Sequence, residues 1–317
     1  MAAPVEAELE KLITEFGSSS VFDEYIKKLR TSAPPSIIYH YTDGAGLRGI
    51  FETGKLWFTD IFNLNDTSEI RHGVKPASDF LRSAASSKDA PPKLRFFAET
   101  VAKELSGHVE ESANYFVCCF SSDGDDLGQW RAYADDGCGY AIGFDAALLE
   151  KAFADAAPSN HATFPLSYDD GHLRSMQIDL ASRAIQIVSQ NVAAITQTQL
   201  IKLSVRLSTW VIHCSTFFKH SGYETEQEYR FLQAHRGDIA VPNLKIRGRP
   251  YSLVRYREFD WKAQAANALK EIVIGPAADV KKAFKFANDC RQVFLSSPDT
   301  IIIKTSEIPY RGNPRNE

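Results

Sequence analysis

Isoleucine and tyrosine dominate the hydrophobic residues 37–41, and only His40 interrupts them before the polar Thr42 and an Asp-Gly pair. This pattern predicts a short strand that ends at a turn. Successive side chains of a strand point to opposite faces, so His40 and Thr42 share one face and Tyr41 takes the other. We expect His40 at the rim of a sheet, although a core histidine with one hydrogen-bonded nitrogen fits the same pattern.

Longer segments follow the helical period, in which apolar residues recur every three or four positions. Residues 200–218 are apolar nearly all round, so we expect the helix that contains them to be buried. The predicted helices cover residues 5–16, 21–29, 44–53, 70–105 with a break near 86–92, 127–134, 146–156, a long helical region at 172–220, and 279–294.

Segments typical of strands lie between these helices. The run 115–121 is almost wholly apolar, which is typical of a strand at the centre of a sheet. Residues 245–260 predict a hairpin of basic character. The other predicted strands cover residues 55–59, 137–145, 224–232, 271–276 and 300–306.

The order of these elements, without an internal repeat, predicts one α+β domain with helical additions. Residues 1–35 form an N-terminal helical extension, and residues 36–311 form the catalytic-like domain. A long helical insertion lies within this domain at 170–220, and residues 312–317 form a tail.

The predicted strand over 224–232 carries an unusual set of charges. Glu224, Glu226, Glu228 and Arg230 alternate with other residues and so share one face of that strand. Three carboxylates on one face repel each other unless cations or solvent relieve them. The segment is therefore either a solvated edge strand or part of a site that uses carboxylates.

The predicted helix over 127–134 offers aromatic and basic side chains. Trp130 and Tyr133 are three residues apart and lie on one helix face, with Arg131 between them in sequence. An aromatic pair at this spacing packs in a core or stacks on a ligand. The spacing leaves both interpretations open.

Composition and charge narrow the class of protein. The chain has 317 residues, 44% hydrophobic and 24% charged, with a net charge of -4. These values are ordinary for a globular protein. The charge argues against a nucleic-acid-binding surface over the whole molecule, and it leaves room for a local basic patch at 245–257.

Five cysteines have the spacing neither of a zinc site nor of a redox pair, so we expect no metal site. The first residues lack the features of a signal peptide, and no apolar window is long enough to span a bilayer. We therefore expect a cytoplasmic protein with no membrane role.

Several short motifs occur in a fixed order, which is more specific than any one of them alone. They are Tyr39-His40-Tyr41-Thr42, Phe62 with Asn65-Asp66 and Glu69, Cys119-Phe120-Ser121, Gln129-Trp130-Arg131 with Tyr133, residues 139–144, Phe218-Lys219, Glu226-Gln227-Glu228-Tyr229-Arg230, Ile274-Gly275-Pro276, and Ile308-Pro309-Tyr310-Arg311. Over residues 36–311 this order resembles a widespread bacterial family of domains of unknown function, DUF2971.

The opening strand and the helix after it also resemble the first core strand of the ADP-ribosyltransferases. The resemblance implies a split β-sheet core, to which the N-terminal helices and the helical insertion are added. It also implies an NAD site made of a first-strand histidine, an aromatic ring that stacks on nicotinamide, and a late-strand glutamate. His40, Tyr41 and Thr42 lie on the first strand, and Glu228 with Glu226 lies on the late one.

In this resemblance His40 orients the ribose, Glu228 binds the ribose 2′-hydroxyl and stabilises positive charge, and Glu226 orients or deprotonates the acceptor. The resemblance leaves the stacking ring open, because the superfamily's usual paired tyrosines are absent from the expected helix. The ring that stacks on nicotinamide comes from Tyr41, Trp130 or Tyr133. A guanidinium from Arg131 or Arg230 neutralises the pyrophosphate of NAD.

These assignments imply an enzyme that cleaves the nicotinamide glycosidic bond of NAD. NAD is then a substrate, and ADP-ribose passes to an unknown acceptor, which is protein, nucleic acid or water. A non-catalytic scaffold that binds protein or nucleic acid through the basic 245–257 hairpin is the first alternative. A metal-dependent nucleotide-processing enzyme that uses the same carboxylates is the second.

Overall fold

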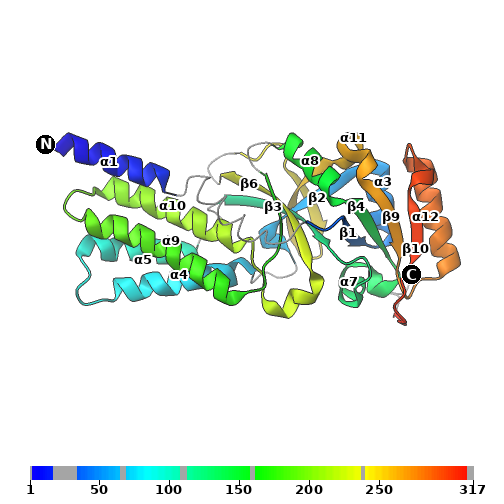
Figure 1. Ribbon diagram of the computed structural model, residues 1–317, viewed down its shortest axis with the longest axis horizontal. Coiled ribbons are helices and arrows are strands. Elements are labelled where there is room, and N and C mark those ends of the chain that lie inside the picture. The colour runs from blue at the N-terminus through cyan, green and yellow to red at the C-terminus, as the bar shows by residue number, and fades with distance from the viewer. Residues whose placement is uncertain are drawn as a thin grey trace.

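The computed structural model describes residues 2–16, 34–64, 69–107, 113–157, 161–236 and 240–312. A bundle of helices forms one end of an elongated molecule, and a mixed sheet with further helices forms the other (Figure 1). Among these residues, no helix combines the length and the apolar character needed to cross a membrane. The helix predicted over 21–29 and the Asn65-Asp66 motif lie outside the described residues.

The described residues contain one ten-stranded sheet. Its main path runs β10-β9-β4-β1-β3-β2-β8-β7, while β6 pairs with β3 and with β5. All strand pairs are antiparallel except β9 with β10. The strands are β1 (Ile37–Thr42), β2 (Lys55–Asp60), β3 (Ala113–Ser121), β4 (Tyr140–Asp145), β5 (His161–Pro165), β6 (Glu228–Arg236), β7 (Lys245–Arg249), β8 (Ser252–Asp260), β9 (Leu269–Ile274) and β10 (Ile302–Thr305).

The sheet forks at β3, which has three partner strands. One edge of β3 pairs with β6 along its whole length. On the other edge, Phe116 and Val117 pair with β2, and Ser121 pairs with β1. Between these two contacts, residues 118–120 have no strand partner on that side within the described chain. The prediction that residues 115–121 occupy the sheet centre is confirmed, and the fork leaves part of this central strand open.

The helical end is a bundle of four helices joined by a fifth. Helices α4 (Glu69–Ala85), α5 (Pro92–Gly107), α9 (Asp170–Gln190) and α10 (Gln197–Ser215) pack together, and α1 (Ala2–Glu15) lies along α10 (Figure 1). Their apolar cluster continues onto β3 and β6 through Val117 and Leu232. The predicted 170–220 insertion is thus paired with α4 and α5, which come much earlier in the chain.

The opposite face of the sheet has its own apolar cluster and its own helices. Ile38 and Phe144 of the sheet pack there with Phe51, Phe153 and Trp261 of the helices. The helices on this side are α3 (Gly44–Thr53), α8 (Ala146–Ala156), α11 (Trp261–Ala265) and α12 (Val280–Phe294). Helix α7 (Leu127–Tyr133) follows β3, and the short 3-10 helices are η1 (Ile61–Asn63), η2 (Asp135–Gly137), η3 (Ser221–Glu226), η4 (Ala266–Ala268) and η5 (Pro298–Thr300).

Two sequence predictions about local structure are corrected. The strand predicted over 224–232 begins only at Glu228, because the preceding residues form η3 and Gln227 adopts a left-handed conformation with φ 42°. Glu224 and Glu226 therefore do not share a strand face with Glu228. Helix α10 is not buried all round, since Ile201 and Val205 are 47% and 52% exposed on its outer side.

Candidate functional site

A cleft of about 420 Å³ opens at the fork in the sheet. Residues 117–120 of β3, which lie between the diverging β1 and β2, form part of its wall. Helix α7, η3 and the first residue of α4 contribute further side chains. Five of the residues predicted from sequence line this one cleft, namely His40, Tyr41, Tyr133, Glu226 and Glu228.

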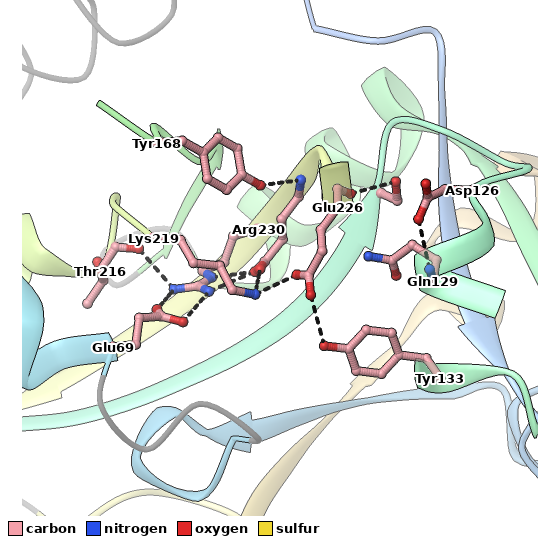
Figure 2. Close-up of polar contacts among 11 residues, drawn as sticks. Glu69, Asp126, Gln129, Tyr133, Tyr168, Thr216, Lys219, Glu226 and Arg230 are labelled. Atoms are coloured by element: carbon pink, nitrogen blue, oxygen red, sulfur yellow. Dashed lines mark hydrogen bonds and ion pairs between the residues drawn. The ribbon is translucent and has the colours of Figure 1, made fainter. Parts of the chain in front are cut away.

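A charged network lies along one side of the cleft, and it consists of Glu69, Lys219, Glu226, Glu228 and Arg230 (Figure 2). The Lys219 ammonium donates to Glu226 Oε2 at 2.5 Å and to Glu228 Oε2 at 2.9 Å. Arg230 Nε donates to the other oxygen of Glu228 at 2.8 Å. Both oxygens of Glu228 are therefore occupied by cations.

Arg230 joins the sheet to the helical bundle. Its guanidinium donates to Glu69 Oε1 at 2.5 Å, at the first residue of α4, and to the Thr216 carbonyl at 3.0 Å, just after α10. The side chain is 0% exposed. A buried guanidinium is tolerated only when its donors are matched, and here two carboxylates and a carbonyl match them.

The network holds its central groups in the charged form. Burial opposes ionisation of Glu228, but Arg230 and Lys219 outweigh it and lower the pKa of this carboxyl to about 2. Burial likewise disfavours the ammonium of Lys219, but Glu228 and Glu226 outweigh it and raise the pKa of Lys219. Burial raises the pKa of Glu69 despite the opposing Arg230. Glu228, held by two cations, is thus more firmly ionised than Glu69.

Glu226 is the most exposed of the three network carboxylates that line the cleft. With three carboxylates and two cations, the ionised network has one negative charge in excess. The side chain of Glu226 is 14% exposed, compared with 5% for Glu228 and 3% for Glu69. Its second oxygen lies 3.4 Å from the Tyr133 hydroxyl, a donor at the cleft wall (Figure 2).

Local structure explains how Glu226 and Tyr133 meet. The Ser121 hydroxyl at the end of β3 donates to the Glu226 carbonyl at 2.8 Å, which ties η3 to the sheet. The Asp126 side chain accepts from the Gln129 amide at 2.8 Å and caps α7, the helix that ends at Tyr133. A strand end and a capped helix thus fix the two side chains.

The His40 side chain forms a hydrogen bond with the backbone of β3 at the edge that lacks a strand partner. Its Nδ1 lies 3.0 Å from the Cys119 carbonyl, within the stretch that lacks a strand partner. A carbonyl only accepts, so Nδ1 carries the proton and Nε2 is left as an acceptor. Burial lowers the pKa of His40, which keeps the ring neutral. The histidine therefore fills a gap in the backbone pairing and also contributes to the cleft wall.

The other side of the cleft is basic and aromatic. Arg247 and Arg249 of β7 line it together with Trp57 of β2, and the Arg247 guanidinium lies 5.0 Å from the Trp57 ring centroid. On the side of the charged network, Tyr223 of η3 lies 4.9 Å from the Lys219 ammonium. None of these five residues was predicted from sequence as a site residue of the NAD-cleaving enzyme. Alternation along the basic hairpin does put Arg247 and Arg249 on one face, a signal that was available.

Four residues predicted to contact a cofactor lie elsewhere, which corrects that part of the prediction. Trp130 is 0% exposed, donates to Asp125 and packs edge-on against Tyr41, so its ring has no free face. Arg230 is buried beneath Glu228, as described above. Thr42 pairs with β4 outside the cleft. Arg131 is 63% exposed, lies 3.8 Å from Asp136 and lines a different surface pocket.

Tyr41 lines the cleft, but its side chain is buried and its hydroxyl is held by backbone groups. Its hydroxyl donates to the Asp123 carbonyl at 2.9 Å and accepts from the Asp126 amide at 3.0 Å. The side chain is 6% exposed. Of the three candidate stacking rings, Tyr133, which is 37% exposed, is therefore the one that presents a surface to the cleft. Within the described part of the chain, no group of three or more His, Cys, Asp or Glu residues is placed to hold a metal ion.

Comparison with known proteins yields one match. No curated protein and no solved structure matches the chain significantly. One segment of the chain matches a family model, and it runs from Gln129 in α7 to Phe231 in β6. It contains Tyr133, Lys219 and the two glutamates Glu226 and Glu228. This segment, residues 129–231, carries most of the charged network and matches the model of a family described as a protein of unknown function, DUF2971.

Proposed function

We propose that this protein is an ADP-ribosyltransferase-like enzyme, which cleaves the nicotinamide glycosidic bond of NAD and transfers ADP-ribose to an acceptor. The acceptor is protein, nucleic acid or water. One observation carries the proposal: a first-strand histidine, a pair of glutamates and an exposed aromatic ring converge on a single cleft. The forked sheet around this cleft is compatible with the split-sheet core of that superfamily.

The reaction sets chemical demands that these residues match. When the bond between the ribose C1′ and nicotinamide breaks, the electron pair leaves with nicotinamide and positive charge builds on the ribose. A carboxylate fixed beside that carbon stabilises the charge. The acceptor then bonds to C1′ and loses a proton, and a carboxylate in reach of the acceptor takes it.

The contacts divide these tasks differently from the assignment made on sequence. Both Glu228 oxygens hold cations, so in our proposal Glu228 positions Lys219 and keeps the wall charged. Glu226 is the more accessible carboxylate and acts on the ribose cation or on the acceptor proton. His40 Nε2 accepts a hydrogen bond from a ribose hydroxyl, and the Tyr133 ring stacks on nicotinamide.

The direct test is NAD consumption by the purified full chain, with released nicotinamide measured by chromatography and added ADP-ribose measured by mass. Glu226→Gln removes the accessible carboxylate but keeps its shape, and we expect kcat to fall by about 10²-fold to 10⁴-fold. Glu224→Gln, in the same 3-10 helix and exposed, is the matched control and should retain full activity.

Two results would refute the proposed function. The first is a folded wild-type protein that neither releases nicotinamide nor adds ADP-ribose to any component of a cell lysate. The second is equal turnover by the Glu226→Gln and Glu224→Gln variants, which would mean that the accessible carboxylate has no part in the chemistry.

A further inference from the structure

Arg247 and Arg249, both on β7, have no carboxylate partner among the described residues. Two other cations of the same hairpin do have one: Lys245 pairs with Glu258 at 2.8 Å, and Arg255 Nε with Asp60 at 2.8 Å. Arg257 of β8 also lacks a carboxylate there, but it donates to the Pro242 carbonyl, Gln233 and His235. Among the residues that the structure describes, Arg249 donates to the Asn63 carbonyl, at 2.9 Å. A carbonyl carries no full negative charge, so within the described part of the chain no carboxylate offsets the charge of Arg249.

Arg247 shows the stronger signal. Its Nε atom is buried and has no hydrogen-bond partner among the described residues. Its other polar contact is a long one, 3.4 Å to the Thr59 hydroxyl, and its guanidinium lies against the Trp57 ring. An unsatisfied buried donor is costly, and the Arg247 side chain lines the cleft, which indicates an acceptor supplied from outside the chain.

The arginines face the charged network across the same cleft. Trp57, beside Arg247, belongs to β2, and Glu228 belongs to β6, while β3 lies between these strands. Where both strands pair with β3, two strand spacings separate β2 from β6, on the order of 10 Å, and β2 diverges from β3 beyond that point. The cleft is thus acidic along one wall and cationic along the other, and a ribose with a 5′-diphosphate is long enough to reach across it.

We propose that Arg247 and Arg249 bind the diphosphate of a nucleotide whose ribose lies at Glu226. This assignment rests on the proposed function for the identity of the ribose end, and it adds the phosphate end and hence the orientation of the substrate. Guanidinium groups match phosphate oxygens with paired hydrogen bonds. The Trp57 ring holds the plane of Arg247 in place before the ligand arrives.

The test is titration calorimetry of the full chain with ADP and with adenosine. In the Arg247→Ala/Arg249→Ala variant we expect ADP to bind about tenfold more weakly or worse, since two charge-assisted contacts are lost. Adenosine, which lacks phosphates, should bind wild type and variant alike. Lys245→Ala removes a cation of the same strand that is already paired with Glu258, and ADP affinity should stay within about twofold of wild type.

A second measurement needs no variant. Inorganic pyrophosphate should displace ADP from the wild-type protein, and failure to compete would overturn the phosphate site even if the double variant did not fold. Equal ADP affinity in wild type and a folded double variant would overturn it too. Tighter binding of a short single-stranded oligoadenylate than of ADP, lost in the double variant, would assign the arginines to nucleic acid and reject the dinucleotide.

The outcomes also separate this inference from the proposed function. If ADP binding depends on both arginines but NAD is never consumed, the phosphate site stands and the enzymatic proposal fails. If NAD is consumed and the double variant keeps the wild-type KM, the enzyme stands and the phosphate site fails.

Discussion

At the scale of single residues, Glu228 shows how a site can be held together by charge. The carboxylate is almost fully buried, and each of its oxygens accepts from a different cation, Lys219 or Arg230. Removing one member of such a cluster leaves the others buried and uncompensated, which costs about 3–5 kcal/mol. Glu228 therefore matters to stability as well as to any chemistry in the cleft.

The first prediction concerns the pH dependence of that contribution. The folded-state pKa of Glu228, about 2, is below its ordinary value of 4.5, so the unfolded chain binds the proton more readily. The stabilisation is complete above about pH 4.5 and is lost as the pH falls toward 2. Glu228→Gln should thus lower the free energy of unfolding by about 3–5 kcal/mol at neutral pH, a difference that shrinks through this window.

Urea denaturation followed by circular dichroism at a series of pH values would measure this difference. Glu224→Gln again serves as the control, because its side chain is exposed and we expect no change at any pH. A difference between wild type and Glu228→Gln that stays constant from neutral pH into acid would contradict the predicted role of the ionised carboxyl.

At the scale of elements, close helix contacts bring the bundle up to the cleft. Gly73 of α4 faces Ser215 at the end of α10, and a Cβ at Gly73 would lie 2.4 Å from the Ser215 Cβ. The Gln177 amide of α9 donates to the Gly73 carbonyl at 3.2 Å and to the Val211 carbonyl at 3.0 Å. Glycine thus permits the approach that places Glu69 and Thr216 within reach of Arg230.

The second prediction is that Gly73→Ala destabilises the protein by about 1–3 kcal/mol, because the added methyl group forces α4 away from α10. Gly49→Ala is a matched control inside another helix, α3, where a Cβ meets nothing within 4 Å. That change should be neutral or stabilising by about 0.5–1 kcal/mol, as expected for glycine in a helix. Equal effects of the two variants in thermal unfolding would argue against the close contact.

At the scale of the whole molecule, the helical bundle and the sheet share one apolar cluster. Leu180 and Leu207 of the bundle belong to the same cluster as Val117 and Leu232 of the sheet. Arg230 adds a polar link between the two parts at the edge of the cleft. The helices of the 170–220 segment, which was predicted as an insertion, therefore belong to the layer that packs on one face of the sheet.

The third prediction follows: replacing residues 170–215 by a short flexible linker should abolish cooperative unfolding, because one face of β3 and β6 would be exposed to water. Deleting α1, which lies along the outside of α10 (Figure 1), should leave a folded protein. Near-ultraviolet circular dichroism and thermal melts distinguish the two cases. A cooperative melt of the 170–215 deletion would show that the sheet folds by itself.

Much of the fold follows from local pattern. The central strand at 115–121, the helices on either side of residues 86–92 and the hairpin near residue 250 all agree with the structure, because each pattern reports burial along one element. The strand predicted over 224–232 was wrong at its start. Alternating charges imitate a strand there, whereas the contacts of Gln227 with Ser122 favour a turn.

The sequence by itself determined the types of residue available and the elements that carry them, including His40 on a strand and Tyr133 on a short helix. Only the tertiary structure decided which of them meet. Trp130 became core and Tyr133 faced the cleft because helix α7 docks with one side against Tyr41. Arg247 joined the site through its contact with Trp57, which is distant in sequence. Such contacts depend on how the strands pair around the fork, and the pattern along one strand does not determine that pairing.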